Sequence, residues 1–525
     1  MTRNEALRAI EQTDLWDVII IGGGATGLGA AVEAASRGYK TVLLEQNDFA
    51  NATSSRSTKL IHGGVRYLQK AQLSLVRESL RERGFLFRNA SHIVHPLKFI
   101  MPASSLFSRL FYGAGLKLYD QLSGTLSLGA STLMNKKEAW ELLPGIQEEK
   151  LAGAIAYYDA QFDDARLAIC LARTVWELGG VALNYLQVKE IKPGRLKSVL
   201  ANCETNREYE LRARVIINAA GVFSDMVRKL DAPSSPPLLS LSRGAHLVVD
   251  SSVFPGRDAL IIPKTQDGRI LFAIPWMERV IIGTTDVPVD NPESDPTPSQ
   301  AELEFLLLEV SRYFKNKIDS GVVRSCFAGL RPLVKPLRQQ HTAALSREHA
   351  ILSSPSGLIT IIGGKWTTYR KMGEDVINIA AKTAGLPQKK SCTPSLHLHG
   401  WTQEPLRTPA EPEHFKNYGS QIAGLRNLLR QFPALAAKLH PRLPYLEVEV
   451  IWGVREEMAR TIQDILARRT RALLLDAQAA VECSSRVAAL MAAELGRDAN
   501  WQKNQCQAFK ATAEKYMPQA TELPR

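Results

Sequence analysis

The chain has 525 residues, a length typical of about three to four structural units. Hydrophobic residues make up 45% and charged residues 22%, and this average composition excludes a chain that is disordered throughout. The 65 Lys and Arg outnumber the 53 Asp and Glu, and the resulting formal charge of +12 favours anionic partners such as phosphorylated metabolites, nucleic acid or an acidic membrane face.

The six cysteines form no C-x-x-C pair, which argues against a zinc ribbon or a disulfide framework and favours a reducing compartment. The first residues contain acids and no apolar core, so we do not expect a secretory signal. The sequence has no run of about 18 uncharged apolar residues, so we expect no transmembrane helix. Peripheral membrane attachment stays open.

A βαβ unit opens the chain. Residues 15–21, LWDVIII, are typical of a buried parallel strand. Three glycines follow, residues 25–37 have a helix-forming composition, and Gly38 predicts the end of that helix. Residues 41–45, TVLLE, predict the next strand, so the whole unit fits within about 30 residues.

The turn between strand and helix matches G-x-G-x-x-G through Gly22, Gly24 and Gly27. In this motif the first glycine permits a tight turn, the second lets a pyrophosphate approach the backbone, and the third lets the helix pack closely on the strand. The pyrophosphate is expected at the first helical turn, at Ala25 and Thr26, where N–H groups lack helical partners. We therefore predict a dinucleotide site.

Glu45 ends the second strand about 20 residues later, where a carboxylate can bind ribose hydroxyls and repel the 2′-phosphate of NADP. The motif alone does not separate FAD from NAD. Two later strand ends favour a long cofactor with a flavin: VIINAAG at 215–221, with Ala220 and Gly221, and LITIIGGKWTT at 358–368. In the second, Gly364, Lys365, Thr367 and Thr368 could contact the flavin ring.

The remaining chain divides into recognisable segments. Residues 53–67 read as a polar loop before a helix at 73–88, and residues 251–300 suggest antiparallel strands and turns. Residues 391–415 are proline-rich and give the clearest linker. Further strands are expected at 215–218, 245–249, 280–282 and 358–362, and mainly helical segments at 423–439, 448–480 and 484–495.

Several motifs together resemble one family, the FAD-dependent glycerol-3-phosphate dehydrogenases. They are SSRSTKLIHGGVRYLQ (54–69), VIINAAGVFSD (215–225), IIGTTDVP (281–288), AGLRPL (328–333), IIGGKWTTYR (361–370) and the segment 443–476. The resemblance implies an α/β, FAD-binding Rossmann-type fold (glutathione-reductase-like, amino-acid-oxidase superfamily). It also implies an interleaved substrate domain with an antiparallel sheet and a C-terminal helical cap. We expect an FAD and substrate unit over residues 14–395, and a linker with the helical unit over 396–525.

The family's reaction is oxidation of sn-glycerol 3-phosphate to dihydroxyacetone phosphate, with hydride transfer from C2 to FAD N5 and electron transfer to a membrane quinone. The sequence has no transit-like segment and no calcium-binding loop, so the resemblance favours a bacterial-type enzyme in the cytoplasm, attached peripherally to the inner membrane. Residues 100–135 match no family motif, and a homodimer is left open. The alternatives are an oxidase that uses O₂, and an amino-acid or amine oxidase of the same superfamily.

This substrate has two chemical demands. Its dianionic phosphate calls for several Arg or Lys side chains, and its secondary alcohol must lose a proton as the hydride leaves. His62 lies in the polar loop, flanked by Gly63 and Gly64, and we nominate it as general base. By resemblance, the substrate residues are Arg66, Tyr67, Arg331, Arg347 and Lys365, with Arg331 and Lys365 also catalytic. Ser54, Ser55 and Thr58 could bind the pyrophosphate or ring, or could be ordinary loop residues.

Other signals are weaker. The pairs His92/His95 and His397/His399 lack a carboxylate cluster, so no metal site is predicted. The basic segment 467–471 reads as a salt-bridged cap helix, and we expect no nucleic-acid binding, although a non-catalytic FAD protein that binds nucleic acid remains a competing hypothesis. Residues 98–122 mix apolar and basic residues, which suits either an interfacial helix on anionic lipid or a core helix.

Overall fold

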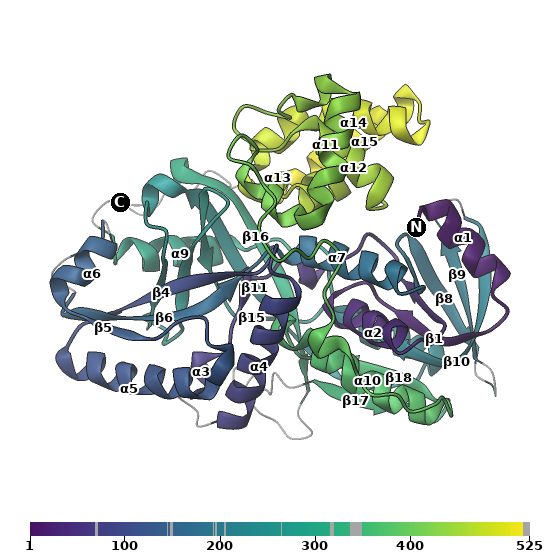
Figure 1. Cartoon of the computed structure of the whole chain (residues 1–525), viewed down its shortest axis with the longest axis horizontal. Coiled ribbons are helices and arrows are strands. Elements are labelled where there is room, and N and C mark those ends of the chain that lie inside the picture. The colour runs from purple at the N-terminus through teal and green to yellow at the C-terminus, as the bar shows by residue number, and fades with distance from the viewer. Residues whose placement is uncertain are drawn as a thin grey trace.

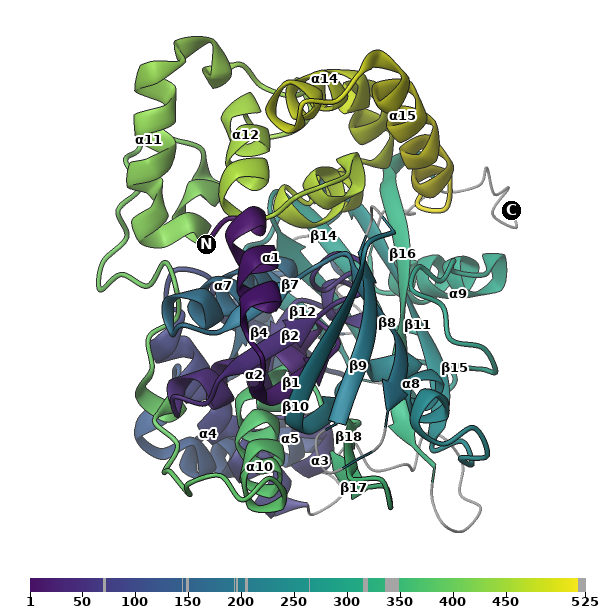
Figure 2. The ribbon, with the colours of Figure 1, turned by 90° about the vertical axis from the view of Figure 1, so that its right-hand side faces the viewer.

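The computed structural model describes residues 1–68, 72–143, 145–147, 151–192, 194, 197–203, 206–263, 265–314, 320–335 and 349–517. Three parts are visible in Figure 1: a sheet with its helices on the right, a second sheet on the left, and a group of C-terminal helices above both. Figure 2 shows the same C-terminal helices, in green and yellow, at the top of the molecule.

The first sheet carries the βαβ unit. Within the described residues its strands run in the order β17–β18–β10–β1–β2–β7, with a β8–β9 hairpin paired to β10. The strands from β18 to β7 are parallel, while β17 and the hairpin are antiparallel. Their bounds are β1 Trp16–Ile21, β2 Thr41–Leu44, β7 Val181–Leu183, β8 Leu186–Lys192, β9 Lys197–Cys203, β10 Glu208–Asn218, β17 Ala350–Ser353 and β18 Leu358–Ile362.

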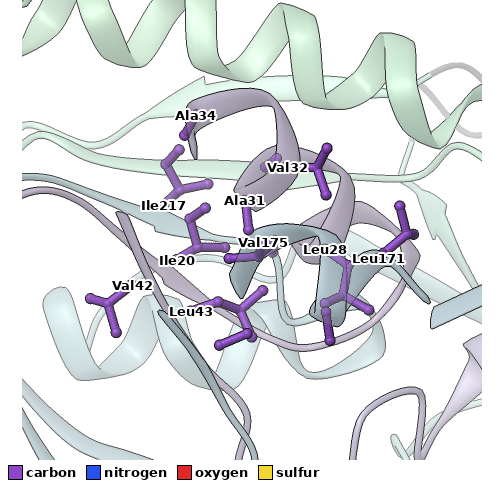
Figure 3. Packing of buried hydrophobic residues seen from close by; sticks show 14 of the residues in the cluster. Ile20, Leu28, Ala31, Val32, Ala34, Val42, Leu43, Leu171, Val175 and Ile217 are labelled. Atoms are coloured by element: carbon purple, nitrogen blue, oxygen red, sulfur yellow. The ribbon is translucent and has the colours of Figure 1, made fainter. Parts of the chain in front are cut away.

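Four helices accompany this sheet: α1 (Arg3–Gln12), α2 (Ala25–Ser36), α7 (Asp164–Glu177) and α10 (Tyr369–Thr383). Figure 3 shows the core in which Leu28 and Ala31 of α2 lie among Ile20 and Ile217 of the sheet and Val175 of α7. Each buried Leu, Ile or Val side chain of this core contributes about 1.5–3 kcal/mol. This packing fixes the start of α2 at the carboxyl end of β1.

The second sheet is mixed and, within the described residues, follows the order β15–β11–β14–β13–β12–β4–β6–β3, with β16 paired to β11 and β5 to β6. The strands are β3 Leu60–Ile61, β4 His95–Ala103, β5 Thr132–Met134, β6 Gly153–Gln161, β11 Leu239–Asp250, β12 Ala259–Ile262, β13 Leu271–Trp276, β14 Arg279–Gly283, β15 Val287–Val289 and β16 Val323–Val334. Its helices are α3 Val65–Leu68, α4 Leu73–Asn89, α5 Leu106–Ser123, α6 Lys136–Leu142 and α9 Gln300–Ser311, while α8 Ser224–Asp231 follows β10.

The C-terminal helices form a cap, by which we mean residues 422–517. Its elements are α11 Ile422–Gln431, α12 Glu447–Glu456, the π-helical turn η12 Asp464–Arg469, α13 Ala472–Leu475, α14 Ala477–Leu495 and α15 Ala499–Glu514. Its core includes Phe327 of β16 and Trp276 of β13, so the cap shares a hydrophobic cluster with the second sheet.

Most expected elements are confirmed, with two corrections. The strand expected at 358–362 and the helices expected at 25–37 and 73–88 are present, and residues 251–300 do contain β12 to β15. Residues 98–122 are not one helix, because the chain continues β4 to Ala103 before α5 begins. Residues 448–480 are not continuous either: α12 ends at Glu456 and positive φ values occur at Met458 and Arg471.

Candidate active site

A cavity of about 740 Å³ lies between the carboxyl ends of the first sheet and the second sheet. Such a position is typical of ligand sites in α/β folds, and the volume falls in the range of about 300–1,000 Å³ usual for them. One end of the cavity is formed by the βαβ unit and the opposite end by strands of the second sheet. The two ends have different chemistry.

At the first end, the glycine turn is shaped as the motif predicts. Gly22 has φ of +114°, and a Cβ there would lie 2.6 Å from Ala219 O. A Cβ at Gly27 would lie 1.9 Å from Gly22 O, so this glycine permits close packing and does not line the cavity. Gly24, Ala25 and Thr26 do line it, which exposes the first turn of α2 to a bound anion.

Glu45 is half-buried in the cavity wall directly after β2. Its carboxylate accepts hydrogen bonds from the backbone N–H of Gly23 at 2.7 Å and of Asn47 at 2.8 Å. Burial raises the pKa of Glu45 above its ordinary value, against the effect of these two hydrogen bonds. A carboxylate has further acceptor sites, so Glu45 can also bind ribose hydroxyls.

Residues 46–58, which we call the nucleotide loop, continue the same wall. Ser54 Oγ accepts a hydrogen bond from Ala25 N at 3.0 Å, and Thr58 Oγ1 lies 2.9 Å from His246 Nε2. Both residues line the cavity, whereas Ser55 does not: its hydroxyl contacts Ala52 O and its carbonyl faces the cap.

The two later strand ends also reach the cavity. Ala220 and Gly221, after β10, and Gly364 and Thr367, after β18, line it. Thr367 Oγ1 exchanges hydrogen bonds of 3.3 Å with the backbone of His62. Thr368 does not line the cavity, because its hydroxyl donates back to Lys365 O at the start of α10.

His62, Lys365 and Arg331, which are far apart in sequence, all line this cavity. Lys365 Nζ donates a 2.8 Å hydrogen bond to Ser79 Oγ of α4. Arg331 extends from β16 and lies 3.2 Å from both Asp286 Oδ1 and Thr284 Oγ1. Gly64 lines the cavity beside His62, while Gly63 lies behind it and donates its N–H to Tyr119 Oη at 2.8 Å.

Three substrate residues of the sequence prediction cannot be placed in this way. Arg66 and Tyr67 belong to the backbone of α3, but their side chains lie outside the described residues. Arg347 also lies outside the described residues.

Sequence reasoning missed several charged or titratable residues of the wall, among them Arg56, His246 and Asp159. His246 of β11 is buried, stacks on Phe327 at 4.6 Å between ring centroids, and has its pKa well below the ordinary value because of burial. Asp159 of β6 is also buried, and burial raises the pKa of its carboxyl. His246 and Asp159 each stand in a mostly buried strand, beside the apolar residues Leu247 and Ala160 respectively, and a titratable residue in such a place is a signal that could have revealed both.

The residues present fit FAD. The first end offers a helix N-terminus, a tight glycine turn and a ribose-binding acid. The cavity then continues past the strand ends after β10 and β18, where Gly221 and Gly364 line it. Gly364 is also required for packing, because a Cβ there would lie 2.2 Å from Met372 Sδ of α10. Among the residues that the structure describes, no group of three or more His, Cys, Asp or Glu side chains is arranged to hold a metal ion.

Comparison with known proteins agrees with this geometry. Residues 17–370 match the family model "FAD dependent oxidoreductase", and residues 359–504 match "C-terminal domain of alpha-glycerophosphate oxidase". The human mitochondrial glycerol-3-phosphate dehydrogenase is 38% identical and the alignment covers 98% of this chain and 75% of the relative. The Arabidopsis thaliana mitochondrial enzyme of the same name is 36% identical, with 98% and 88% covered.

Solved structures extend the comparison. A glycerol-3-phosphate dehydrogenase from Bacillus halodurans, complexed with FAD, superposes with a TM-score of 0.76 at 27% identity over 99% of both chains. An L-alpha-glycerophosphate oxidase from Mycoplasma pneumoniae has a TM-score of 0.58 at 17% identity, covering 72% of this chain and 97% of its own, and so shares the fold. The fold and the site together define an FAD-dependent oxidoreductase. Within that class the chain belongs to the FAD-dependent glycerol-3-phosphate dehydrogenase family.

Proposed function

We propose that this chain oxidises sn-glycerol 3-phosphate to dihydroxyacetone phosphate and passes the electrons to a membrane quinone. The observation that carries the proposal is that Arg331, Lys365 and His62, which are far apart in sequence, all line the cavity that also takes in the nucleotide motif. Relatives that share this family and almost the full length of the chain are named for glycerol 3-phosphate.

Arg331 and Lys365 are suited to bind the substrate phosphate. The Arg331 guanidinium is oriented by Ser242, Thr284, Asp286 and Thr285 O, at 3.2–3.4 Å. These acceptors fix the guanidinium in position at the cavity wall, and the Lys365 ammonium adds a second positive charge to the lining.

His62 is suited to take the proton of the C2 hydroxyl. Its backbone is fixed by Thr367, and the two following glycines let the loop approach a ring closely. When bound, FAD supplies the hydride acceptor for C2. The amino-acid oxidase alternative requires a site for a carboxylate and a neutral amine, which needs fewer cations than the cavity lining provides.

The direct test is anaerobic addition of glycerol 3-phosphate to the purified, FAD-loaded protein. We expect the visible flavin absorption to bleach with this substrate and not with glycine, proline or glycerol. Bleaching by amino acids instead would assign the chain to the amine-oxidising branch. Absence of bleaching with every substrate would contradict the proposal.

An apolar part of the cavity wall supports a quinone as the electron acceptor. Phe99 and Met101 of β4, Phe272 of β13 and Tyr112 of α5 form this wall. On α5, Tyr112 packs edge-to-face on Phe111, whose side chain is 61% exposed, so apolar surface continues from the cavity to the outside. We expect reoxidation of the reduced enzyme by a short-chain quinone to be faster than by O₂, measured by stopped-flow absorbance; the reverse order would favour an oxidase.

The outer face of α5 is suited to contact a membrane. Its exposed apolar residues are Leu106, Phe107, Leu110, Phe111 and Leu118, and Leu133 of β5 packs beside Gly113 of the same helix. Monomeric proteins rarely leave such a contiguous patch uncovered. The net charge of +12 favours an anionic surface as the partner. Among the described residues, no helix combines the length and hydropathy needed to span a bilayer. We therefore include peripheral attachment through α5, on the cytoplasmic side of the inner membrane, in the proposed function.

A further inference from the structure

The nucleotide loop carries a buried carboxylate whose charge is neutralised by the cap. Asp48 accepts hydrogen bonds from Arg469 Nη1 at 2.6 Å and Nη2 at 2.9 Å, and from Arg468 Nε at 2.5 Å. Asn184 Nδ2 donates a fourth, at 3.0 Å. Burial disfavours the ionised carboxyl, but the two guanidinium groups more than offset this and hold the pKa of Asp48 below its ordinary value.

The loop is held by the cap at two further points. Near its end, Arg56 Nη2 donates to Tyr516 Oη at 3.1 Å, and Tyr516 Oη donates to Asp295 Oδ1 at 2.7 Å. Next to Ser54, the Ser55 carbonyl accepts a 2.8 Å hydrogen bond from Arg471 Nη2. The cap therefore holds the loop at Asp48, near its start, and at Ser55 and Arg56, near its end.

The cap also contacts the turn that forms the neighbouring wall. Asn184 donates to Met458 O at 3.0 Å, and Tyr185 Oη donates to Asp464 at 2.7 Å. This turn is in direct contact with the ribose-binding region, because Leu186 N donates to Glu45 O and Tyr185 N donates to Asn47 O, both at 2.8 Å. Both walls of the nucleotide end thus depend on the same segment of the cap, residues 457–471.

Backbone strain is concentrated at this junction. Of the eight non-glycine residues with positive φ in the described chain, five lie on its two sides: Ala50, Lys59, Tyr185, Met458 and Arg471. Such conformations are unfavourable for residues with a Cβ, and they persist only when surrounding contacts impose them. The buried charges add a second dependence, since Asp48 without the two arginines would be an unpaired buried ion.

We propose that the cap is the clamp of the FAD site: Arg468, Arg469 and Arg471 fix the nucleotide loop in its cofactor-binding conformation and thereby set how tightly FAD is held. The clamp acts through Glu45 and Ser54 and does not touch the reacting atoms, so Asp48 and the three arginines are positioning residues. Because coupling between two sites is reciprocal, bound FAD must strengthen cap docking by the same factor.

The first test measures FAD affinity by titrating apoprotein with FAD and following the quenching of flavin fluorescence. We expect D48N and R469Q each to raise the Kd for FAD about tenfold or more, because the free loop must then be ordered by the cofactor itself. Y185F removes the hydrogen bonds of one hydroxyl to Thr461 and Asp464 of the cap and no charge, so it should raise the Kd in the same direction while keeping the fold. The KM for glycerol 3-phosphate of the fully FAD-loaded variants should stay close to that of the unmodified chain.

R37Q is the matched control. Arg37 forms a buried pair with Glu33 of α2, similar in kind to the Asp48 pairs, but it lies at the end of α2 away from the loop. We expect R37Q to lower the melting temperature and leave the Kd for FAD unchanged. An equal loss of FAD affinity in R37Q and R469Q, or an unchanged Kd in D48N, R469Q and Y185F, would overturn the clamp.

The second test measures the reciprocal effect by hydrogen–deuterium exchange of residues 457–471 in apoprotein and FAD-loaded protein. In the unmodified chain we expect exchange of this cap segment to slow when FAD binds, although the segment lies behind the loop. In Y185F the difference between the two states should shrink. Identical exchange of the segment with and without FAD in the unmodified chain would show that the cap and the cofactor site are not coupled.

Discussion

Arg331 depends on the absence of a side chain on the neighbouring strand. Arg331 and Gly244 lie close together on the paired strands β16 and β11, and a Cβ at Gly244 would lie 2.4 Å from Arg331 Nη2 and 2.6 Å from Thr284 Oγ1. The glycine therefore leaves the space in which the guanidinium meets its acceptors. Sequence alone gave Arg331 through a family motif, but not Gly244, because the contact depends on the pairing of strands more than 80 residues apart.

Loss of the Arg331 guanidinium should weaken substrate use. We expect R331A to raise KM for glycerol 3-phosphate and to lower kcat/KM by on the order of 10²-fold or more, because a charge-assisted phosphate contact disappears. R324A is the control on the same strand, since Arg324 pairs with Asp250 at the surface and does not line the cavity. Steady-state kinetics checks both variants, and an unchanged KM in R331A would remove this residue from the phosphate site.

The loop that contains His62 depends on a buried hydrogen-bond network. Tyr119 Oη accepts from Gly63 N at 2.8 Å and donates to Asp159, which in turn accepts from Arg83 Nη1 at 2.6 Å. We expect Y119F to slow flavin reduction on the order of tenfold, since small displacements of a reacting group reduce its effectiveness. Single-turnover mixing gives this rate, and the substrate concentration at half-saturation should change little.

Y39F separates positioning from stability in that experiment. Tyr39 also donates a buried hydrogen bond, to Pro387 O at 2.6 Å, but it lies in the first sheet's core away from the cavity. If Y39F slowed flavin reduction as much as Y119F, the effect of Y119F would be a general loss of stability and the network would have no positioning role.

Among the elements, those defined by local pattern were predictable and those defined by distant contacts were not. The strand at 358–362 and helix α2 follow from short apolar runs and glycine signals, and both are present. The break after α12 is set by Glu457, which is buried against Arg166 and Arg469 from other parts of the fold. The expected pairing of the basic segment 467–471 with nearby acids is present, since Arg468 pairs with Asp464 and Arg469 lies 3.6 Å from Glu457. What local pattern could not predict is Asp48, some 420 residues away, which pairs with both arginines.

The stability of the chain should fall in acid because of a buried histidine, His92, that packs against the connection from α10 to the cap. The contact is close, because a Cβ at Gly400 of this connection would lie 2.9 Å from His92 Nε2. Burial lowers the pKa of His92 to about 3, from 6.5. The unfolded chain therefore binds more protons than the folded chain between these pH values, and the free energy of unfolding must fall as pH drops from 6.5 toward 3.

Urea unfolding at pH 7 and at pH 5 measures this dependence. We expect H92Q to lose less stability than the unmodified chain over this interval, because its side chain does not titrate. H397Q serves as the control, since His397 is exposed and contacts only the neighbouring turn at Trp401. A pH dependence in H92Q equal to that of the unmodified chain would show that His92 does not contribute.

At the scale of the whole molecule, some positively charged side chains form buried ion pairs, while the net charge of +12 favours an anionic surface as partner. Several arginines are buried as ion pairs, among them Arg83, Arg166, Arg468, Arg469 and Arg471. They join the cap, the first sheet and the second sheet into one unit. The cap and α5 lie at opposite ends of that unit (Figures 1 and 2), so a membrane in contact with α5 leaves the cap on the far side.

This arrangement predicts how the chain binds vesicles. Binding should be stronger to vesicles with anionic lipid than to neutral ones and should weaken as salt rises, because screening reduces the attraction of the +12 chain to the surface. F107S/F111S should lose binding at every salt concentration, since Phe107 and Phe111 are 78% and 61% exposed and supply the apolar contact. F432S, which changes an exposed aromatic residue of the cap, should bind like the unmodified chain. Cosedimentation with vesicles measures the binding of all three proteins.

Size-exclusion chromatography of F107S/F111S tests whether a second copy of the chain covers the α5 face instead. If the unmodified chain is a dimer that dissociates in F107S/F111S, and the double variant still binds vesicles, the second copy and not the membrane is the partner of this face.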